Sequence, residues 1–169
     1  MIGRVVGVVD VPRTGRRLGV DVGSVRIGTA VSDPDGLLAV PLETVPRGDG
    51  DLSRLAGLVV ANDVVEVVVG LPVSLDGTDG PSARAARDFA AALAAAVPVP
   101  VRLVDERLST AGAHRALQAA GVSGRRRRAV VDESAAAMIL QTALDTVRST
   151  GRPAGVAVAA AEPDREDPA

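Results

Sequence analysis

Hydrophobic and polar residues alternate over the first part of the chain in a pattern typical of β-strands. Residues 17–23 and 26–33 form two such segments joined by a Gly-Ser turn, and residues 37–45 form a third after a turn rich in Asp, Pro and Gly. Pro41 lies within the third segment, and proline is confined mainly to edge strands. We therefore predict three antiparallel strands, with the third at an edge of the sheet.

The rest of the chain alternates helical and strand-like patterns. Leucine and valine recur at helical spacing over residues 51–61, and the β-branched run at 64–69 indicates a strand buried on both faces. Further elements are predicted in this order: an alanine-rich helix from Pro81 to Pro98, a strand at 99–104, a short helix at 110–120 and a last helix at about 130–148. The predicted fold is α/β, with a mixed five-stranded sheet, three antiparallel strands and then parallel strands, and helices on both faces.

Length and composition indicate one domain. The chain of 169 residues is too short for two full-sized domains. We place the domain at residues 16–148, after an N-terminal extension (1–15) and before a tail (149–169) whose composition predicts disorder. No apolar run approaches the ~20 residues needed to span a bilayer, and no signal peptide is recognisable. We therefore expect a cytoplasmic protein with no membrane contact.

The residue types present exclude several kinds of site. The chain has no cysteine and one histidine, His114, which argues against disulfides, thiolate zinc sites and serine-histidine triads. The net charge is −2, but without the acidic tail the chain is neutral, and residues 125–128 form an uninterrupted basic run. This run is either a solvated loop or a phosphate contact. With a single Phe and no Trp or Tyr, nucleic acid would be held by its backbone or shape rather than by base stacking.

Acidic residues stand at the ends of elements that should meet at one edge of the sheet. Asp21 lies inside the first strand, Asp105 and Glu106 close the fifth, and Asp132 lies near the start of the last helix. Helical spacing places Asp132 on the same face as the apolar Ala136. Strand alternation directs only one of Asp105 and Glu106 like a core residue, and the pattern leaves open which one.

A group of carboxylates repels itself unless a cation is present. Oxygen ligands suit Mg²⁺ or Mn²⁺, and two such ions about 3.5–4 Å apart can activate water for phosphodiester hydrolysis. In this interpretation Asp21 is a metal ligand, and Gly23 lets a phosphate backbone approach closely. The alternative is that Asp21 only caps a turn.

Four motifs carry a resemblance to a known family. They are GVDVGSVRIG at 19–28, GLPVSLDG at 70–77, DERLST at 105–110 and VDESAA at 131–136. Together they resemble the YqgF family of pre-16S rRNA nucleases, also called Holliday junction resolvase-like proteins, over about residues 16–148. The resemblance implies an RNase H-like fold, nuclease activity on the 5′ end of precursor 16S rRNA, and a metal site formed by Asp21, Glu106 and Asp132.

Substrate contacts are expected around these acids. The loop at 74–80 is either a substrate loop or simply the approach to the next helix, and it departs from the family pattern at Ser74, where asparagine is common. The residues that we assign to substrate binding are Gly23, Arg26, Ser74, Asp76, Arg107, Arg125, Arg126, Arg127 and Arg128.

Other functions remain open from the sequence. Asp-x-Gly between two strands also opens the ATP-binding fold of actin, sugar kinases and heat-shock chaperones, but that architecture needs two lobes. A resolvase acting on four-way DNA junctions would be a symmetric dimer. A non-catalytic RNA-binding module for ribosome assembly would keep the fold without turnover. We expect the partners to be precursor 16S rRNA or branched DNA, and ribosomal assembly particles, bound by a monomer or homodimer.

Overall fold

The computed structural model describes residues 14–74, 76–108 and 125–161, and for residues 125–134 it describes the backbone alone. The elements are β1 (Arg16–Val22), β2 (Arg26–Ser32), β3 (Ala39–Pro46), α1 (Asp51–Ala61), β4 (Val64–Leu71), α2 (Pro81–Ala96), β5 (Val101–Asp105), a 3-10 turn (Glu106–Leu108), α4 (Arg125–Thr150) and β6 (Val156–Ala157). None of the helices in this part of the chain is long and apolar enough to cross a membrane.

The strands form one mixed sheet in the order β3-β2-β1-β4-β5-β6. β2 pairs antiparallel with β1 and β3, whereas β4 pairs parallel with β1 and β5. The predicted antiparallel and parallel strands and the edge position of β3 are confirmed. The predicted number of strands is corrected, because β6 adds a sixth strand antiparallel to β5.

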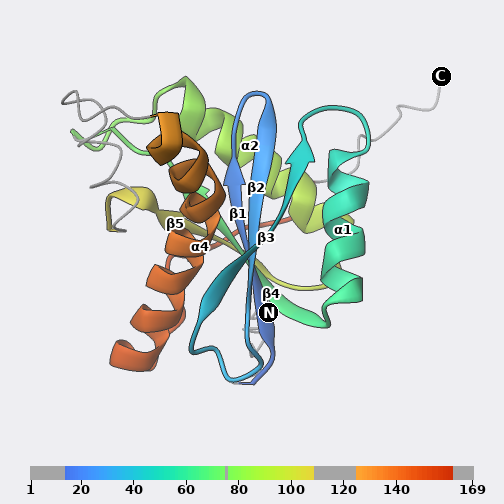
Figure 1. The fold of residues 1–169 in the computed structure, drawn as a ribbon, viewed down its shortest axis with the longest axis vertical. Helices are drawn as coiled ribbons and strands as arrows, with labels where there is room; N and C mark the ends of the chain where they lie inside the picture. Colours follow the sequence, from blue (N-terminus) through green and yellow to red (C-terminus); the bar gives the residue numbers. More distant parts are fainter. Residues whose placement is uncertain (1–13, 75, 109–124, 162–169) are drawn as a thin grey trace, which may run out of the picture.

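Helices cover both faces of the sheet, as predicted (Figure 1). α1 and α2 pack on one face through an apolar cluster that includes Leu55, Phe89 and Leu93, and α4 packs on the other through Ile139 and Leu140. The central strand β4 is buried along nearly its whole length, because helices exclude water from both of its faces.

A glycine in β1 allows α4 to approach the sheet closely. A Cβ on Gly19 would lie 2.7 Å from the carbonyl oxygen of Ala136 and 2.7 Å from Cβ of Leu140, closer than van der Waals contact permits. Further along α4, Leu144 lies near Gly36, beside the start of β1. α4 therefore runs antiparallel to β1, and its N-terminal half points toward the carboxyl end of that strand.

Residues 149–161, for which the composition predicted disorder, form the end of a helix and a strand in the structure. α4 continues to Thr150, and β6 then pairs with β5 along the edge that would otherwise be open. Arg102 on β5 donates hydrogen bonds to the carbonyl oxygens of Ala154 (2.7 Å) and Gly155 (2.9 Å). The backbone of Ala161 donates to Ala91 of α2. Backbone pairing and an arginine fork fix a segment whose composition alone predicted disorder.

Two predicted features involve residues near the start of α4. The predicted helix at 110–120 lies outside the described residues. The last helix begins at Arg125 rather than near residue 130, so the basic run forms its first turn instead of a preceding loop.

Candidate active site

Asp21 occupies the penultimate position of β1. Gly19, two residues earlier in the strand, faces α4, and because side chains alternate along a strand Asp21 is directed to the same side. The residue is half-buried and lies opposite Gly28 of β2. The carboxylate thus stands at the carboxyl end of a central strand, where ligands of mixed and parallel sheets commonly bind.

Glu106 is the first residue after β5, and its side chain turns inward. It is only 5% exposed although it begins a surface 3-10 turn. A Cβ added to Gly70 would lie 2.7 Å from Glu106 Oε1 and 2.6 Å from Cδ1 of Ile139. The carboxylate therefore lies directly over the Gly70 backbone and beside α4. Of the two adjacent acids, Glu106 is the one directed like a core residue.

Gly70 lies between the two candidate ligands. The β1–β4 register pairs Val20 with Val69, so one residue further along both strands Asp21 stands next to Gly70. Glu106 reaches the same glycine from β5, the strand on the other side. Asp21 and Glu106 therefore flank Gly70 on the face of the sheet that carries α4.

Asp105 is more exposed than Glu106 and binds Arg107. The guanidinium donates from Nε to both carboxylate oxygens (3.1 and 3.0 Å) and from Nη2 to Oδ2 (2.6 Å). Hydrogen bonds from the Arg107 side chain, together with its backbone N–H, hold the pKa of Asp105 below its ordinary value. Arg107, predicted to contact phosphate, is thus held in a defined position by a partner that is itself ionised.

The loop after β4 brings two predicted substrate residues near Arg107. Arg107 Nη1 lies 3.4 Å from the carbonyl oxygen of Ser74. Asp76 accepts hydrogen bonds from the hydroxyl (2.7 Å) and backbone N–H (3.0 Å) of Thr78, and these lower its pKa. Gly77, at φ +82°, closes the turn by donating to Ser74. Asp76 therefore orders this loop through its contacts with Thr78.

The β1–β2 turn gives Gly23 a structural role. Its N–H donates to the carbonyl oxygen of Arg26 (3.0 Å), and a Cβ on Gly23 would lie 2.5 Å from that oxygen. The turn itself thus requires glycine, which is a reason different from the predicted approach of a phosphate. Arg26 follows as an exposed residue at the start of β2.

The side chains of Asp132 and of Arg125, Arg126, Arg127 and Arg128 lie outside the described part of the structure. The backbone places position 132 in α4, one turn before Ala136, which packs over Gly19. Since α4 runs antiparallel to β1, one turn back along the helix corresponds to about two residues forward along the strand. Position 132 of the helix backbone therefore lies beyond Gly19 in the direction of Asp21.

The donor set fits a hard divalent cation. Asp21 and Glu106 supply carboxylate oxygens, which Mg²⁺ and Mn²⁺ prefer. Because Gly70 has no side chain, the Glu106 carboxylate has room above the Gly70 backbone, in space that a Cβ would otherwise occupy. Among the residues with described side chains no group of three potential ligands is present. A third protein ligand would have to come from the undescribed side chains, among which is Asp132.

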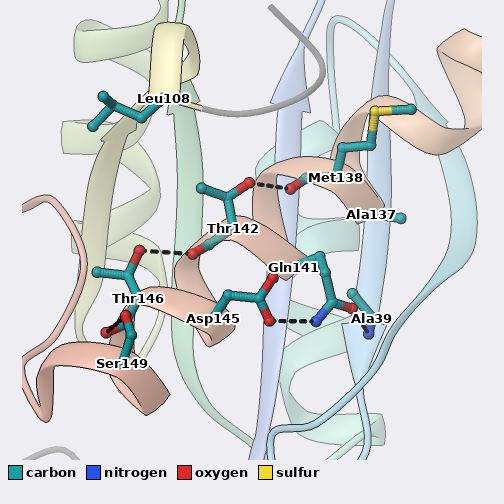
Figure 2. Close-up of a pocket in the computed structure, with 9 residues that line it drawn as sticks. All are labelled: Ala39, Leu108, Ala137, Met138, Gln141, Thr142, Asp145, Thr146 and Ser149. Carbon is teal, nitrogen blue, oxygen red and sulfur yellow. Dashed lines mark hydrogen bonds between the residues drawn. The ribbon is translucent and has the colours of Figure 1, made fainter.

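A separate surface cavity of about 580 Å³ lies along α4 (Figure 2) and includes none of the predicted site residues. Its threonine hydroxyl groups already bond to carbonyls of the same helix, since Thr142 donates to Met138 and Thr146 donates to Thr142. The polar groups drawn there mainly stabilise the helix and its contact with Ala39. The cavity is therefore not the candidate active site.

Comparisons with known proteins identify the family of this chain. Residues 15–146 match the family described as "RuvX: Holliday junction resolvase". The chain belongs to the RuvX family. A relative from Nocardioides sp., which carries the name of a pre-16S rRNA nuclease, is 55% identical over 149 residues, covering 85% of this chain and 96% of the relative. A relative of the same name from Mycobacterium leprae is 60% identical over 141 residues, covering 82% and 77%.

A solved structure is similar at the level of the fold. RuvC from Thermus thermophilus, in complex with a Holliday junction substrate, superposes with a TM-score of 0.52 at 18% sequence identity, covering 82% of this chain and 99% of RuvC. The predicted RNase H-like fold is confirmed, as is the family inferred from the four motifs. RuvX membership also confirms the predicted class of enzyme, a nuclease that hydrolyses phosphodiester bonds.

Two residues that matter in this geometry were missed by sequence reasoning. Gly70 begins the second motif, but its role became visible only from the side chain above it. Arg47 follows β3 and has no pattern that marks it, although it contacts the β1–β2 turn. A glycine at the end of a buried strand is a signal that could have identified the first of these.

Proposed function

We propose that this RuvX protein is a metal-dependent nuclease that acts in maturation of the 5′ end of precursor 16S rRNA. The observation that carries the proposal is the placement of Asp21 and Glu106 on either side of Gly70, at the carboxyl ends of their strands. Relatives that carry the name of pre-16S rRNA nucleases support the choice of substrate.

Asp21, Glu106 and Asp132 would hold Mg²⁺ or Mn²⁺ at this site. When bound, the ion supplies an activated water and stabilises the leaving oxygen of the scissile phosphodiester. Glu106 is suited to this role because its burial next to Ile139 restricts the carboxylate to one orientation. Asp21 is suited because it sits inside a strand that is paired on both sides, so that its backbone position is fixed before substrate arrives.

Positively charged residues around the acids would bind the nucleic-acid backbone. Arg107 is prearranged by Asp105 beside Ser74, while Arg26 lies at the exposed turn after Asp21. The basic first turn of α4, residues 125–128, would add further positive charge. Gly23 and Asp76 stay proposed substrate-site residues because they shape the turn beside Arg26 and the loop beside Arg107. Backbone contacts of this kind make affinity fall with salt. We place the activity in the cytoplasm, on RNA within assembling ribosomal particles.

A second candidate function is resolution of four-way DNA junctions. The family description names a Holliday junction resolvase, and the same carboxylates could serve either nucleic acid. Symmetric resolution of a junction needs two active sites, so this function requires a homodimer. RNA maturation is compatible with a monomer.

The test is cleavage of two labelled substrates, a precursor 16S rRNA 5′ segment and a four-way DNA junction, with Mg²⁺ or Mn²⁺. We expect wild-type protein to cut the RNA, and Asp21→Asn and Glu106→Gln to lower kcat by about 100-fold or more because a ligand to the ion is removed. Asp88→Asn, on the exposed side of α2, is the matched control and should remain fully active. Full activity of either site variant would contradict the site.

The choice of substrate is decided by the same assay. Preferential cutting of the junction would replace RNA maturation by resolution, and binding of RNA without cutting under any metal would favour a non-catalytic assembly module. The salt dependence of RNA binding, measured with residues 125–128 changed to glutamine, tests the basic run. The slope of log affinity against log salt concentration should become shallower by about 0.7–0.9 for each phosphate that is no longer neutralised.

A further inference from the structure

The turn between β1 and β2 is exposed, yet it is held firmly. Val25 at its tip is 75% exposed, and such a tip would ordinarily be mobile on its own. The turn begins two residues after Asp21, so any displacement of the turn is transmitted to the end of β1. What holds the turn therefore bears directly on the geometry of the candidate site.

Arg47 binds this turn from the end of β3. Its guanidinium donates from Nη1 to the carbonyl oxygen of Gly23 (3.2 Å), and its backbone N–H donates to the carbonyl oxygen of Val25 (2.9 Å). Within the turn, Gly23 donates to Arg26. Two carbonyls of the turn are thus fixed by one residue from a different strand.

The same guanidinium also contacts α1 and α2, the two helices that cover one face of the sheet. Nε lies 3.5 Å from Asp51 Oδ2 at the start of α1. The guanidinium carbon lies 4.8 Å from the ring centroid of Phe89 on α2, a cation–π contact with the single aromatic residue of the chain. Asp51 is itself fixed, because it accepts a hydrogen bond from the Gly48 backbone (3.1 Å). Arg47 therefore connects the turn to the rigid core.

Arg54 provides an internal comparison. It also joins α1 to β3, through two hydrogen bonds to Glu43 (2.7 and 2.9 Å), but its side chain is 57% exposed. Both of these bonds lead to β3, away from the β1–β2 turn. Each arginine thus links β3 or its end to α1 through an acidic residue, Asp51 for Arg47 and Glu43 for Arg54, but only Arg47 also contacts the turn.

We propose that Arg47 is a positioning residue for the nuclease site: it fixes the Gly23–Val25 backbone, so that the end of β1 with Asp21 and the start of β2 with Arg26 keep one relative geometry. The inference rests on the proposed function, in which Asp21 holds the ion and Arg26 binds the nucleic-acid backbone. Geometric displacement of about 1 Å at a catalytic group can cost ~100-fold in rate.

The chemistry of arginine makes the role specific. Lysine at this position would keep a positive charge near Phe89 and Asp51, but a single ammonium cannot also reproduce the planar fork that reaches Gly23. Arg47→Lys should therefore retain the fold and only part of the activity. Arg47→Ala should remove the guanidinium anchor altogether and leave the turn held by backbone bonds alone.

The experiment compares Arg47→Ala, Arg47→Lys and the control Arg54→Ala, each assayed for RNA cleavage and for amide hydrogen exchange. We expect Arg47→Ala to lower kcat about 10- to 100-fold, Arg47→Lys to be intermediate, and Arg54→Ala to stay within about twofold of wild type. The amides of Gly23 and Arg47 should exchange faster in both Arg47 variants, while the amides that pair β1 with β4 stay protected. This local loss of protection distinguishes positioning from general destabilisation.

Wild-type kcat with unchanged exchange at Gly23 in Arg47→Lys, or in a folded Arg47→Ala, would overturn the inference. Equal effects in Arg47→Ala and Arg54→Ala would also overturn it. If Arg47→Ala does not fold, Arg47→Lys decides alone. Failure of the proposed function is recognised separately, because Asp21→Asn would then match wild type while the exchange measurement still reports whether Arg47 holds the turn.

Discussion

Gly70 lies directly beneath Glu106: a Cβ built on the glycine would be 2.7 Å from Glu106 Oε1. The missing side chain makes room for a buried carboxylate beside Asp21. We expect Gly70→Ala to displace Glu106 and to lower kcat by about tenfold or more, because the metal ligand no longer keeps its orientation. The added methyl group also meets Ile139, so unfolding free energy should fall by about 1–3 kcal/mol.

Gly57 supplies the control for this substitution. It lies within α1 and a Cβ there would have no neighbour within 4 Å. Gly57→Ala should raise the unfolding free energy by about 0.5–1 kcal/mol through helix propensity and leave cleavage unchanged. Urea denaturation and steady-state kinetics on both variants check the pair. Unaltered kcat in a folded Gly70→Ala would show that the position of Glu106 does not matter for cleavage.

A divalent ion should stabilise the folded protein through Asp21. At 100 times its dissociation constant, an ion bound only by the folded state adds about 2.7 kcal/mol to the unfolding free energy. Mn²⁺ should therefore raise the melting temperature of wild type and of Asp88→Asn, and Asp21→Asn should lose this shift. Without metal, Asp21→Asn should be at least as stable as wild type, because one repulsive charge is removed. An equal Mn²⁺ shift in all three proteins would place the ion elsewhere.

Much of the fold could be predicted because its information is local. The apolar segment around Asp21 and the β-branched run of β4 each indicate a strand, and the inward stripe with Phe89 and Leu93 indicates the buried face of a helix. The structure confirms these three elements. The placement of acids at strand ends likewise followed from the order of the strands. The choice between Asp105 and Glu106 did not, because both faces of β5 are apolar, Leu103 in the cluster under α2 and Val104 in the cluster under α4, and alternation alone does not say which face carries the site.

Long-range contacts account for what the sequence did not reveal. β6 lies against β5 where Arg102, about fifty residues earlier, binds Ala154 and Gly155. Arg47 reaches Gly23 across 24 positions. Neither partner carries a local pattern that marks the other, so composition predicted a disordered tail and Arg47 carried no prediction.

Glu66 should make the unfolding free energy of the protein depend on pH. Its side chain is buried 3.7 Å from Arg17, and Oε2 has no hydrogen-bond partner within the described part of the chain. Burial raises the pKa of Glu66, and the charges of Arg17 and Arg102 only partly oppose this. A carboxyl whose pKa is raised on folding contributes stability that is fully present below its unfolded pKa of about 4.3 and is lost as pH rises through the folded value.

We therefore expect the unfolding free energy of Glu66→Gln, relative to wild type, to increase as pH rises above about 4.3. Urea denaturation at a series of pH values measures it. Glu43→Gln is the control of opposite sign, because hydrogen bonds from Arg54 lower the pKa of Glu43. Its stability relative to wild type should decrease, slightly, as pH rises toward the same value from below. Parallel pH profiles for Glu66→Gln and wild type would contradict the raised pKa.

Alanine substitutions at Gly155 and Gly151 distinguish the cost of close packing in the C-terminal segment from the cost of an unfavourable backbone conformation. Both have positive φ, +68° and +69°, so alanine costs each of them about 1–2 kcal/mol from conformation alone. They differ in space, because a Cβ on Gly155 would lie 1.9 Å from the carbonyl oxygen of Leu103, whereas Gly151 has no neighbour within 4 Å. Gly155→Ala should therefore destabilise the protein clearly more than Gly151→Ala, and should expose the backbone of β5 to hydrogen exchange at Leu103. Equal losses in the two variants would mean that β6 does not pack against β5 in solution, and that the edge of the sheet is open as the composition of the tail first suggested.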